Sequence, residues 1–199
     1  MHKRGQVEIR QGANLPHGTQ DGAAYSVTFR LADSLPDVAV QRLLAAKEKI
    51  ELAVKHNDRP PSLEELARLS QAKSEVFLQL LDEGHGACHL KDDRVALMVA
   101  NALKHFADAR YKLFAWCVMP NHVHALFQPL GEFDLSNTLH SWKSFTAKEA
   151  NKLLGRTGGF WQRESYDHLI RDPADFNHHF RYIRENPSAA GLKGWKWWG

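Results

Sequence analysis

Little in this sequence suggests a membrane protein, a disulfide-stabilised protein or a strongly charged one. Its two cysteines, Cys88 and Cys117, form no CxxC pair and provide no disulfide framework. The longest aliphatic run, Val95–Ala100, is far too short to cross a bilayer. Residues 1–4 lead into polar sequence rather than into the apolar segment of a signal peptide. These absences predict a cytoplasmic protein with no membrane partner.

The net charge is also small, at +3 over 199 residues, and is weak evidence for a nucleic-acid partner. It is, however, unevenly distributed. Residues 44–93 contain seven basic and ten acidic side chains, whereas the rest of the chain has an excess of six basic ones. The chain outside this acidic stretch is therefore modestly basic, which is compatible with a DNA-binding face.

The acidic stretch overlaps a predicted helical hairpin at 37–83. Its first helix, over 37–57, places apolar residues at helical spacing among lysines and glutamates. After two prolines, Ser62–Glu65 matches a capping box that begins a second helix, which should run to about Asp82. We interpret the hairpin as an insert in a more basic domain.

The remaining segments alternate between predicted strands and helices. Strand patterns cover 24–30, 110–118, 122–128 and 161–171, and helical patterns cover 94–108, 135–154 and 172–186. This β-α-β-β-α-β-α order is typical of the ferredoxin-like split βαβ fold, an α+β arrangement of an antiparallel sheet with helices on one side. We expect one domain over 1–199, with the hairpin as an insert and an aromatic tail at 193–199.

Two histidines, His122 and His124, stand two residues apart in one predicted strand. Residues i and i+2 of a strand point to the same face, so the two imidazoles should lie side by side. Val123, Ala125 and Phe127 should point the other way, toward a core. Two imidazoles on a rigid strand are half of a metal site. The alternative, surface histidines on an exposed sheet face, is not excluded by so short a motif.

The last predicted helix has clear boundary signals. Asp172 suits its N-cap and Pro173 its first helical position, and Asp175 places a further carboxylate in the first turn. Pro187 disfavours helical geometry at the residue before it. We therefore expect the helix to end at Asn186.

One side of this helix carries His179, Tyr182 and Asn186 at positions i, i+3 and i+7. A tyrosine can act as a nucleophile, but a phenol with a pKa of about 10 needs help at neutral pH. A divalent metal held by His122, His124 and the amide oxygen of Asn186 could orient a phosphate for in-line attack. Alternatively, Tyr182 packs against the sheet with its hydroxyl in water.

Three separated blocks, AWCVMPNHVH at 115–124, FWQRESYDH at 160–168 and RYIRENP at 181–187, occur in a characteristic order. With them the chain resembles the REP-associated branch of the IS200-like single-tyrosine (Y1) HUH transposases. The resemblance implies an HUH endonuclease fold. It also implies DNA transposition by metal-dependent nicking and rejoining of single-stranded DNA at hairpins, through a 5′-phosphotyrosine intermediate.

The resemblance also assigns roles. His122 and His124 match the HUH metal ligands, Asn186 the third ligand and Tyr182 the nucleophile. It implies Mg²⁺ or Mn²⁺ as the cation, although ligand chemistry alone would suit Zn²⁺ or Mn²⁺ better. The implied partner is single-stranded or hairpin DNA at the nucleoid, with a monomer favoured over a homodimer.

Several further residues are candidates for contact with DNA. Tyr166 is either a competing nucleophile or a residue that stacks on a base. Stacking or phosphate contacts are also expected from Trp161, Arg163, His168, Lys143 and Lys148. For these residues the alternative is a tryptophan in the core and charges on a solvated face.

Two other functions remain open from the sequence. A domesticated relative could bind repeat hairpins without turnover, and a metal hydrolase could use metal-activated water, with Tyr182 only positioning the substrate. The tail, Trp195–Gly199, could stack on DNA, dock on the sheet or lie in a partner interface.

Overall fold

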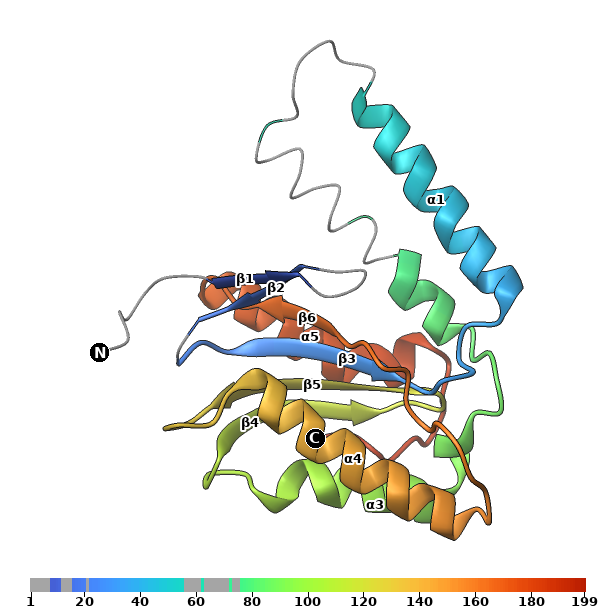
Figure 1. Cartoon of the computed structure of the whole chain (residues 1–199), viewed down its shortest axis with the longest axis vertical. Coiled ribbons are helices and arrows are strands. Elements are labelled where there is room, and N and C mark those ends of the chain that lie inside the picture. The colour runs from blue at the N-terminus through green and yellow to red at the C-terminus, as the bar shows by residue number, and fades with distance from the viewer. Residues whose placement is uncertain (1–7, 12–15, 21, 56–61, 63–71, 73–75) are drawn as a thin grey trace. The chain divides into compact units, whose positions relative to one another are not determined.

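The computed structural model describes residues 8–11, 16–20, 22–55, 62, 72 and 76–199 (Figure 1). The chain divides into two compact units. One comprises Met1–Ala32 and His89–Gly199 and contains the main sheet, and the other comprises Asp33–Cys88. None of the helices in the described ranges is long and apolar enough to span a membrane.

The main sheet has four strands in the order β4-β5-β3-β6. The strands are β3 (Tyr25–Arg30), β4 (Tyr111–Val118), β5 (His122–Pro129) and β6 (Tyr166–Leu169). All neighbouring pairs are antiparallel, and β3 is central, between β5 and β6. This is the strand order of the split βαβ fold, so the predicted α+β, ferredoxin-like class is confirmed.

Two further strands, β1 (Glu8–Gln11) and β2 (Pro16–Thr19), pair as a separate antiparallel hairpin that the sequence did not predict. The short 3₁₀ helix η1 (His89–Lys91) leads into the first helix of the sheet unit. The remaining helices of this unit are α3 (Asp93–His105), α4 (Leu135–Leu153) and α5 (Pro173–Ala189).

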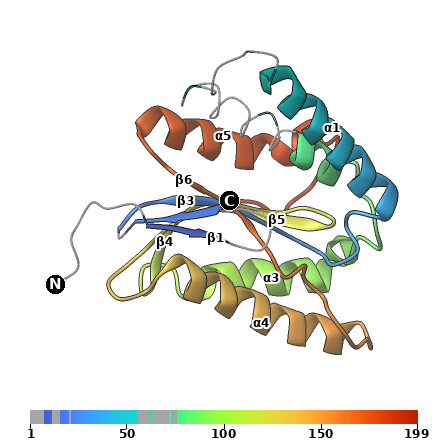
Figure 2. The same ribbon diagram turned by 45° about the horizontal axis from the view of Figure 1, so that its top comes forward.

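Helices cover both faces of the sheet. Figure 2 shows α3 and α4 on one face and α5 on the other. The apolar side of α5, including Ile183, packs against Ala115 and Cys117 of β4 and Leu126 of β5. The expectation that all helices lie on one side is therefore wrong. The physical reason is that β4 and β5 carry apolar side chains on both faces of the sheet, so the second face must also be buried under a helix.

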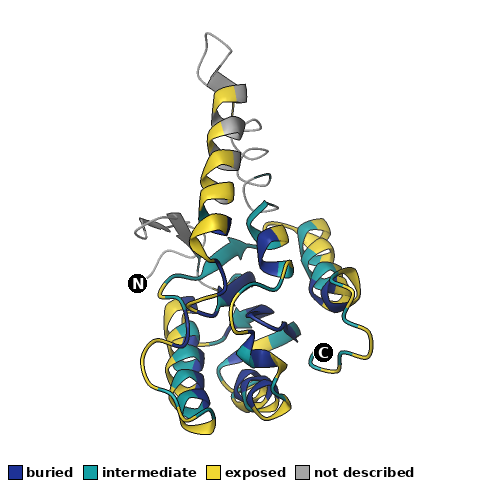
Figure 3. Cartoon of the chain, turned by 90° about the vertical axis from the view of Figure 1, so that its right-hand side faces the viewer, coloured by how far each residue is buried: buried dark blue, intermediate teal, exposed yellow. Residues whose placement is uncertain are grey.

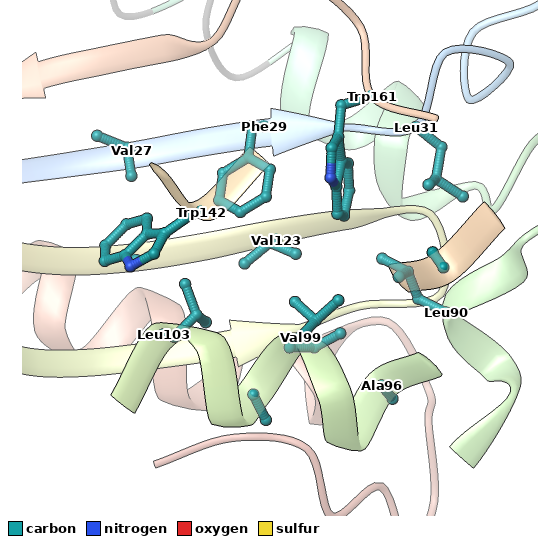
Figure 4. Close-up of a cluster of buried hydrophobic side chains, with 14 of the residues drawn as sticks. Val27, Phe29, Leu31, Leu90, Ala96, Val99, Leu103, Val123, Trp142 and Trp161 are labelled. Carbon is teal, nitrogen blue, oxygen red and sulfur yellow. The ribbon is translucent and has the colours of Figure 1, made fainter. Parts of the chain in front are cut away.

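The face toward α3 and α4 holds the main hydrophobic core (Figure 4). Phe29 packs edge-on against Trp161, with ring centroids 4.8 Å apart. The Tyr111 hydroxyl donates to the Leu103 carbonyl at 2.8 Å and accepts from Trp142 Nε1 at 2.9 Å, so these buried polar atoms are satisfied. This core fixes β3, β4 and β5 relative to the two helices.

A β-bulge interrupts β4 between Leu113 and Ala115. Before it, Tyr111 and Leu113 face α3 and α4, whereas Phe114 and Ala115 both pack on the α5 side. The extra residue shifts the alternation of side chains along the strand. It thereby places Ala115 and Cys117 on the α5 side and Trp116 and Val118 on the side of α3 and α4.

Helix α5 begins as predicted and extends further than predicted. The Asp172 side chain accepts hydrogen bonds from the backbone N–H groups of Ala174 and Asp175, at 2.8 and 2.9 Å. The predicted end at Asn186 is wrong, because the helix continues through Pro187 to Ala189. The Asn186 carbonyl still accepts from the Ala190 N–H at 2.9 Å. A proline this close to the end therefore removes one hydrogen bond without ending the helix.

The C-terminal tail docks along the free edge of β4. Trp116 N–H donates to the Gly199 carbonyl at 2.8 Å, and Gly199 N–H returns a hydrogen bond to Trp116 at 3.0 Å. Val118 N–H donates to the Trp197 carbonyl at 2.8 Å. Of the three possibilities left by the sequence, the structure supports docking on the sheet, which covers an otherwise open strand edge.

The unit Asp33–Cys88 contains α1 (Asp37–Lys55) and a helical segment at 76–82. Leu35, Ala39, Leu80 and Leu81 form its small buried cluster. Most described side chains of α1 are exposed (Figure 3). The predicted capping box at Ser62–Glu65 lies mostly outside the described residues.

Candidate functional site

The predicted histidine pair lies on the face of the sheet that α5 covers. His122 and His124 are each only 1% exposed. Val123, Ala125 and Phe127, between and beyond them on β5, belong to the core on the opposite face. The predicted alternation along β5 is confirmed, and the alternative of surface histidines on an exposed sheet is wrong.

A chain of hydrogen bonds connects the two imidazoles to their neighbours. His122 Nδ1 lies 2.7 Å from Asn121 Oδ1, His122 Nε2 lies 2.9 Å from His124 Nε2, and His124 Nδ1 lies 2.7 Å from Thr28 Oγ1. An amide oxygen can only accept, so His122 carries its proton on Nδ1 and accepts at Nε2. His124 Nε2–H then donates to His122, and the Thr28 hydroxyl donates to His124 Nδ1.

This arrangement is consistent with two neutral histidines. Burial, followed by the charge of His124, lowers the pKa of His122 well below its ordinary value. Burial, followed by the charge of His179, lowers the pKa of His124 to about 3. Neutral imidazole is the form that binds metal ions. A simple tautomer change at His124, with its Nδ1–H donating to Thr28, would direct both Nε2 lone pairs to one ion.

Helix α5 brings Tyr182 and Asn186 to the same side of the sheet. The ring of Tyr182 lies edge-on to that of His124, with centroids 5.4 Å apart. Asn186 is 2% exposed, and its Oδ1 has no hydrogen-bond partner within the described part of the chain. A buried carbonyl oxygen without a donor is costly unless an ion or another group satisfies it. Two neutral imidazoles and this oxygen are a donor set that fits a divalent cation.

Thr28 and Asn121 are the site residues that the sequence analysis missed. Each orients one imidazole through the ring nitrogen that faces away from the shared Nε2 contact. Asn121 stands directly before the histidine motif, so its position in the sequence could have identified it as a site residue. Thr28 pairs with His124 across β3 and β5, and only the strand register reveals that.

Two of the residues predicted to contact DNA make contacts within the protein. Trp161 is 8% exposed, lies in the main core and donates from Nε1 to Thr146 Oγ1 at 2.8 Å. Lys143 Nζ donates to the carbonyls of Gln162 and Arg163, at 2.8 and 2.7 Å. Burial lowers the pKa of Lys143 to about 8. The expectation that these two side chains reach DNA is therefore not supported by their surroundings.

The other predicted contacts occupy different surroundings. Arg163 and Lys148 are exposed. His168, on β6, contacts Asp175 and is partly exposed to solvent. Tyr166 pairs with Thr28 across the sheet, and Thr28 pairs with His124, so these three residues form one row on the α5 face. By its position, Tyr166 therefore remains an alternative to Tyr182 as the nucleophile.

A pocket of about 710 Å³ lies between α3 and α4, on the opposite face. Its lining includes the exposed apolar side chains of Leu97, Phe145 and Leu153. None of the histidine, tyrosine or asparagine residues of the site lines it. This pocket and the concentration of reactive groups are thus on different faces of the sheet.

Comparison with known proteins finds that the chain is similar to transposases. The model of the family described as IS200-like transposases matches residues 89–186. The REP-associated tyrosine transposase of Escherichia coli is 32% identical over 85 residues, which are 42% of this chain and 48% of that protein. A Haemophilus influenzae protein named "Putative REP-associated tyrosine transposase" is 31% identical over 99 aligned residues, and the match covers 43% of this chain and 56% of that protein. The chain thus spans about half the length of these curated relatives.

A solved structure of a REP-associated tyrosine transposase bound to a REP hairpin has a similar fold. Its TM-score is 0.51 at 18% sequence identity, and the match covers 97% of this chain and 82% of that one. At this identity the likeness concerns the fold. It agrees with the α+β, ferredoxin-like class inferred from the sequence.

Proposed function

Because residues 89–186 match the model of the IS200-like transposase family, we propose that the protein nicks and rejoins single-stranded DNA at hairpin-containing sequences. Tyr182 would be the nucleophile, forming a covalent bond to a 5′ phosphate. The observation that carries this proposal is the shared buried site, in which the Tyr182 ring lies against His124 on the same α5 face as Asn186.

We propose that His122, His124 and Asn186 hold a divalent cation, Mg²⁺ or Mn²⁺. The two Nε2 atoms 2.9 Å apart and the Asn186 Oδ1 without a partner among the described residues support this ligand set. When bound, the cation would neutralise charge on the scissile phosphate. Asn121 and Thr28 would keep the two imidazoles in the ligating orientation.

The covalent step can be written with balanced atoms. The Tyr182 oxygen bonds to phosphorus as the phosphorus–3′-oxygen bond breaks, and the phenol proton is transferred overall to the departing 3′ oxygen. The product is a 5′-phosphotyrosine and a free 3′ hydroxyl. Because the phosphoester is conserved, a 3′ hydroxyl can attack it in return, and the strand is rejoined without an external energy source.

We propose hairpin DNA at the nucleoid as the partner, because the similar solved structure is a REP-associated transposase bound to a REP hairpin. The exposed Arg163 and Lys148 are the remaining candidates for phosphate contacts. We also propose that the protein acts as a monomer, with the helical hairpin at about 37–83 as an insert in one HUH-type domain.

The test is formation of a covalent adduct. The protein is incubated with hairpin oligonucleotides of varied flanking sequence and Mn²⁺, and products are separated under denaturing conditions. We expect an adduct with the wild type and Tyr166→Phe, and none with Tyr182→Phe. An adduct lost only in Tyr166→Phe would reassign the nucleophile. Cleavage without any adduct would indicate a hydrolase, and binding without cleavage a non-catalytic hairpin-binding protein.

A further inference from the structure

A second cluster of ligand-type side chains lies between β6 and the first turns of α5. His168 Nε2, on β6, is 2.9 Å from Asp175 Oδ2 and 3.1 Å from Oδ1. His179 Nε2, one helical turn after Asp175, is 3.5 Å from the same carboxylate. One ligand atom of each residue lies within 4.8 Å of the others. The function proposed above uses none of these three side chains.

The two imidazoles of the cluster point toward the same carboxylate. The two imidazoles stack with centroids 4.5 Å apart and planes 29° apart, so both Nε2 atoms approach one carboxylate. Asp175 and His179 stand at i and i+4 on α5, a spacing that places both on one side of a helix. The Arg171 N–H donates to Asp175 Oδ2 at 3.0 Å and holds the carboxylate in place.

We propose that His168, Asp175 and His179 form a second metal site, for a divalent transition ion such as Zn²⁺. Two imidazoles and one carboxylate are a common protein ligand set for such ions and leave a position open for water or another ligand. The three side chains are 18–23% exposed, so an ion can enter from solvent into a partly desolvated site.

The protonation states of the cluster also suit a cation. Burial, followed by the charges of neighbouring histidines, lowers the pKa of His179 to about 4, so its imidazole is neutral near pH 7. Burial opposes ionisation of Asp175, but hydrogen bonds from His168 and the Arg171 N–H, together with the nearby histidine charges, lower its pKa overall. The cluster therefore offers an ionised carboxylate and a neutral imidazole to an ion.

An ion at this position would join β6 to the first half of α5. The same helix carries Tyr182 and Asn186, so the second site would fix the helix that presents them. It would position these residues without touching the reacting atoms. The proposal does not depend on the DNA chemistry proposed above, because metal binding can be measured without DNA.

The first experiment counts Zn²⁺ in a chain that lacks the other histidine pair. The 199-residue variant His122→Gln/His124→Gln is titrated with Zn²⁺ by calorimetry, and Co²⁺ is added separately to record its visible absorption. We expect one Zn²⁺ per chain and a Co²⁺ spectrum. Adding His168→Gln or Asp175→Asn should weaken Zn²⁺ binding by at least about tenfold and remove the spectrum.

The matched control is His178→Gln, on the same helix and next to His179, which should leave Zn²⁺ binding unchanged. His168→Gln leaves the Asp172 cap and the Arg171–Asp175 contact in place, and far-UV circular dichroism checks that each variant folds. Absence of Zn²⁺ binding in the His122→Gln/His124→Gln chain would overturn the proposal. So would binding that survives both His168→Gln and Asp175→Asn.

The same count in the otherwise wild-type chain separates the two proposed sites. Loss of one of two bound ions on His168→Gln supports both sites. One ion that disappears with His168→Gln supports this site and contradicts the His122–His124–Asn186 site as a Zn²⁺ ligand set. One ion that persists in His168→Gln contradicts this site alone.

Discussion

The two faces of the sheet have opposite chemical characters, although the same strands build both. The face toward α3 and α4 is filled with apolar and aromatic side chains whose few polar atoms hydrogen-bond to one another. The face toward α5 buries two histidines and an asparagine among fewer apolar residues. On β5, alternate residues serve the two faces, so one strand provides both the packing and the reactive groups.

This contrast shows how a buried polar site can be held rigidly. Polar groups buried under α5 contribute less to stability than an apolar core would, because their desolvation opposes folding. The intervening residues of β5, Val123, Ala125 and Phe127, are fully buried in the core on the opposite face and hold the strand in place. Stability and chemistry should therefore respond separately to substitutions on the two faces.

The largest expected effect is on stability, at the core face. Phe29→Ala removes a buried ring that packs against Trp161 and should lower the free energy of unfolding by about 3–5 kcal/mol. Phe180→Ala, which truncates a half-buried ring on α5, should lower it by less. Urea unfolding measures both. Equal losses would contradict the assignment of the main core to the α3 and α4 face.

Acid should destabilise the metal-free protein through the α5 face. His122 and His124 have folded pKa values below their ordinary value of about 6.5, which they regain on unfolding. Between about pH 6.5 and the folded pKa values, the unfolded chain binds more protons, so the free energy of unfolding falls as pH falls. The expected slope is about 1.4 kcal/mol per pH unit for each histidine.

This pH dependence is measured by urea unfolding in the presence of a chelator at pH 7.5, 6.5 and 5.5. His122→Gln/His124→Gln should reduce the slope and leave the part due to His179, whose folded pKa is also lowered. His140→Gln, at an exposed position of α4, should leave it unchanged. A slope as steep in the double variant as in the wild type would locate the acid sensitivity elsewhere.

Two buried threonines offer a closer comparison between the faces. Thr28→Val removes the partner of His124 and should weaken Mn²⁺ binding by about 10–100-fold. Thr146→Val removes the acceptor of Trp161 Nε1 and should cost about 1–3 kcal/mol of stability, with Mn²⁺ affinity unchanged. Calorimetric titration and urea unfolding of both variants measure this crossed pattern. If Thr146→Val also weakened Mn²⁺ binding, the two faces would not be separable.

The smallest expected effect concerns the surface. Arg163→Ala should weaken hairpin binding about equally for different sequences and reduce the dependence of log affinity on log salt by about 1. Lys112→Ala, an exposed basic residue on β4, is the control and should change neither. Fluorescence anisotropy over a range of salt concentrations provides the measurement. An unchanged salt dependence in Arg163→Ala would remove this residue from the interface.

The sequence was sufficient for features with a local physical cause. Period-two alternation identified β5 and the shared direction of His122 and His124, and the Asp172 cap identified the start of α5. Helical spacing grouped Tyr182 with Asn186. These features depend on residues close together in the chain, where geometry follows directly from periodicity and capping.

Features that depend on long-range packing could not be predicted. Periodicity does not specify which face of a sheet a helix covers, so the position of α5 was missed. From the sequence, the aromatic side chain of Trp161 is suited to stacking on a base. Only its contacts with Phe29 and Thr146 identify it as a core residue. The partnership of His168 with Asp175 likewise joins a strand to a helix and leaves no periodic signal.

The central claim, that Tyr182 is the nucleophile beside the histidine pair, is tested most directly by mapping the attached nucleotide. The adduct formed with hairpin DNA and Mn²⁺ is digested with a protease that cuts before aspartate. This separates Tyr182, in residues 175–199, from Tyr166, in residues 134–166, and mass spectrometry follows. The account predicts a nucleotide on the 175–199 peptide, at Tyr182. A nucleotide on the 134–166 peptide, or cleaved DNA with neither peptide modified, would contradict it.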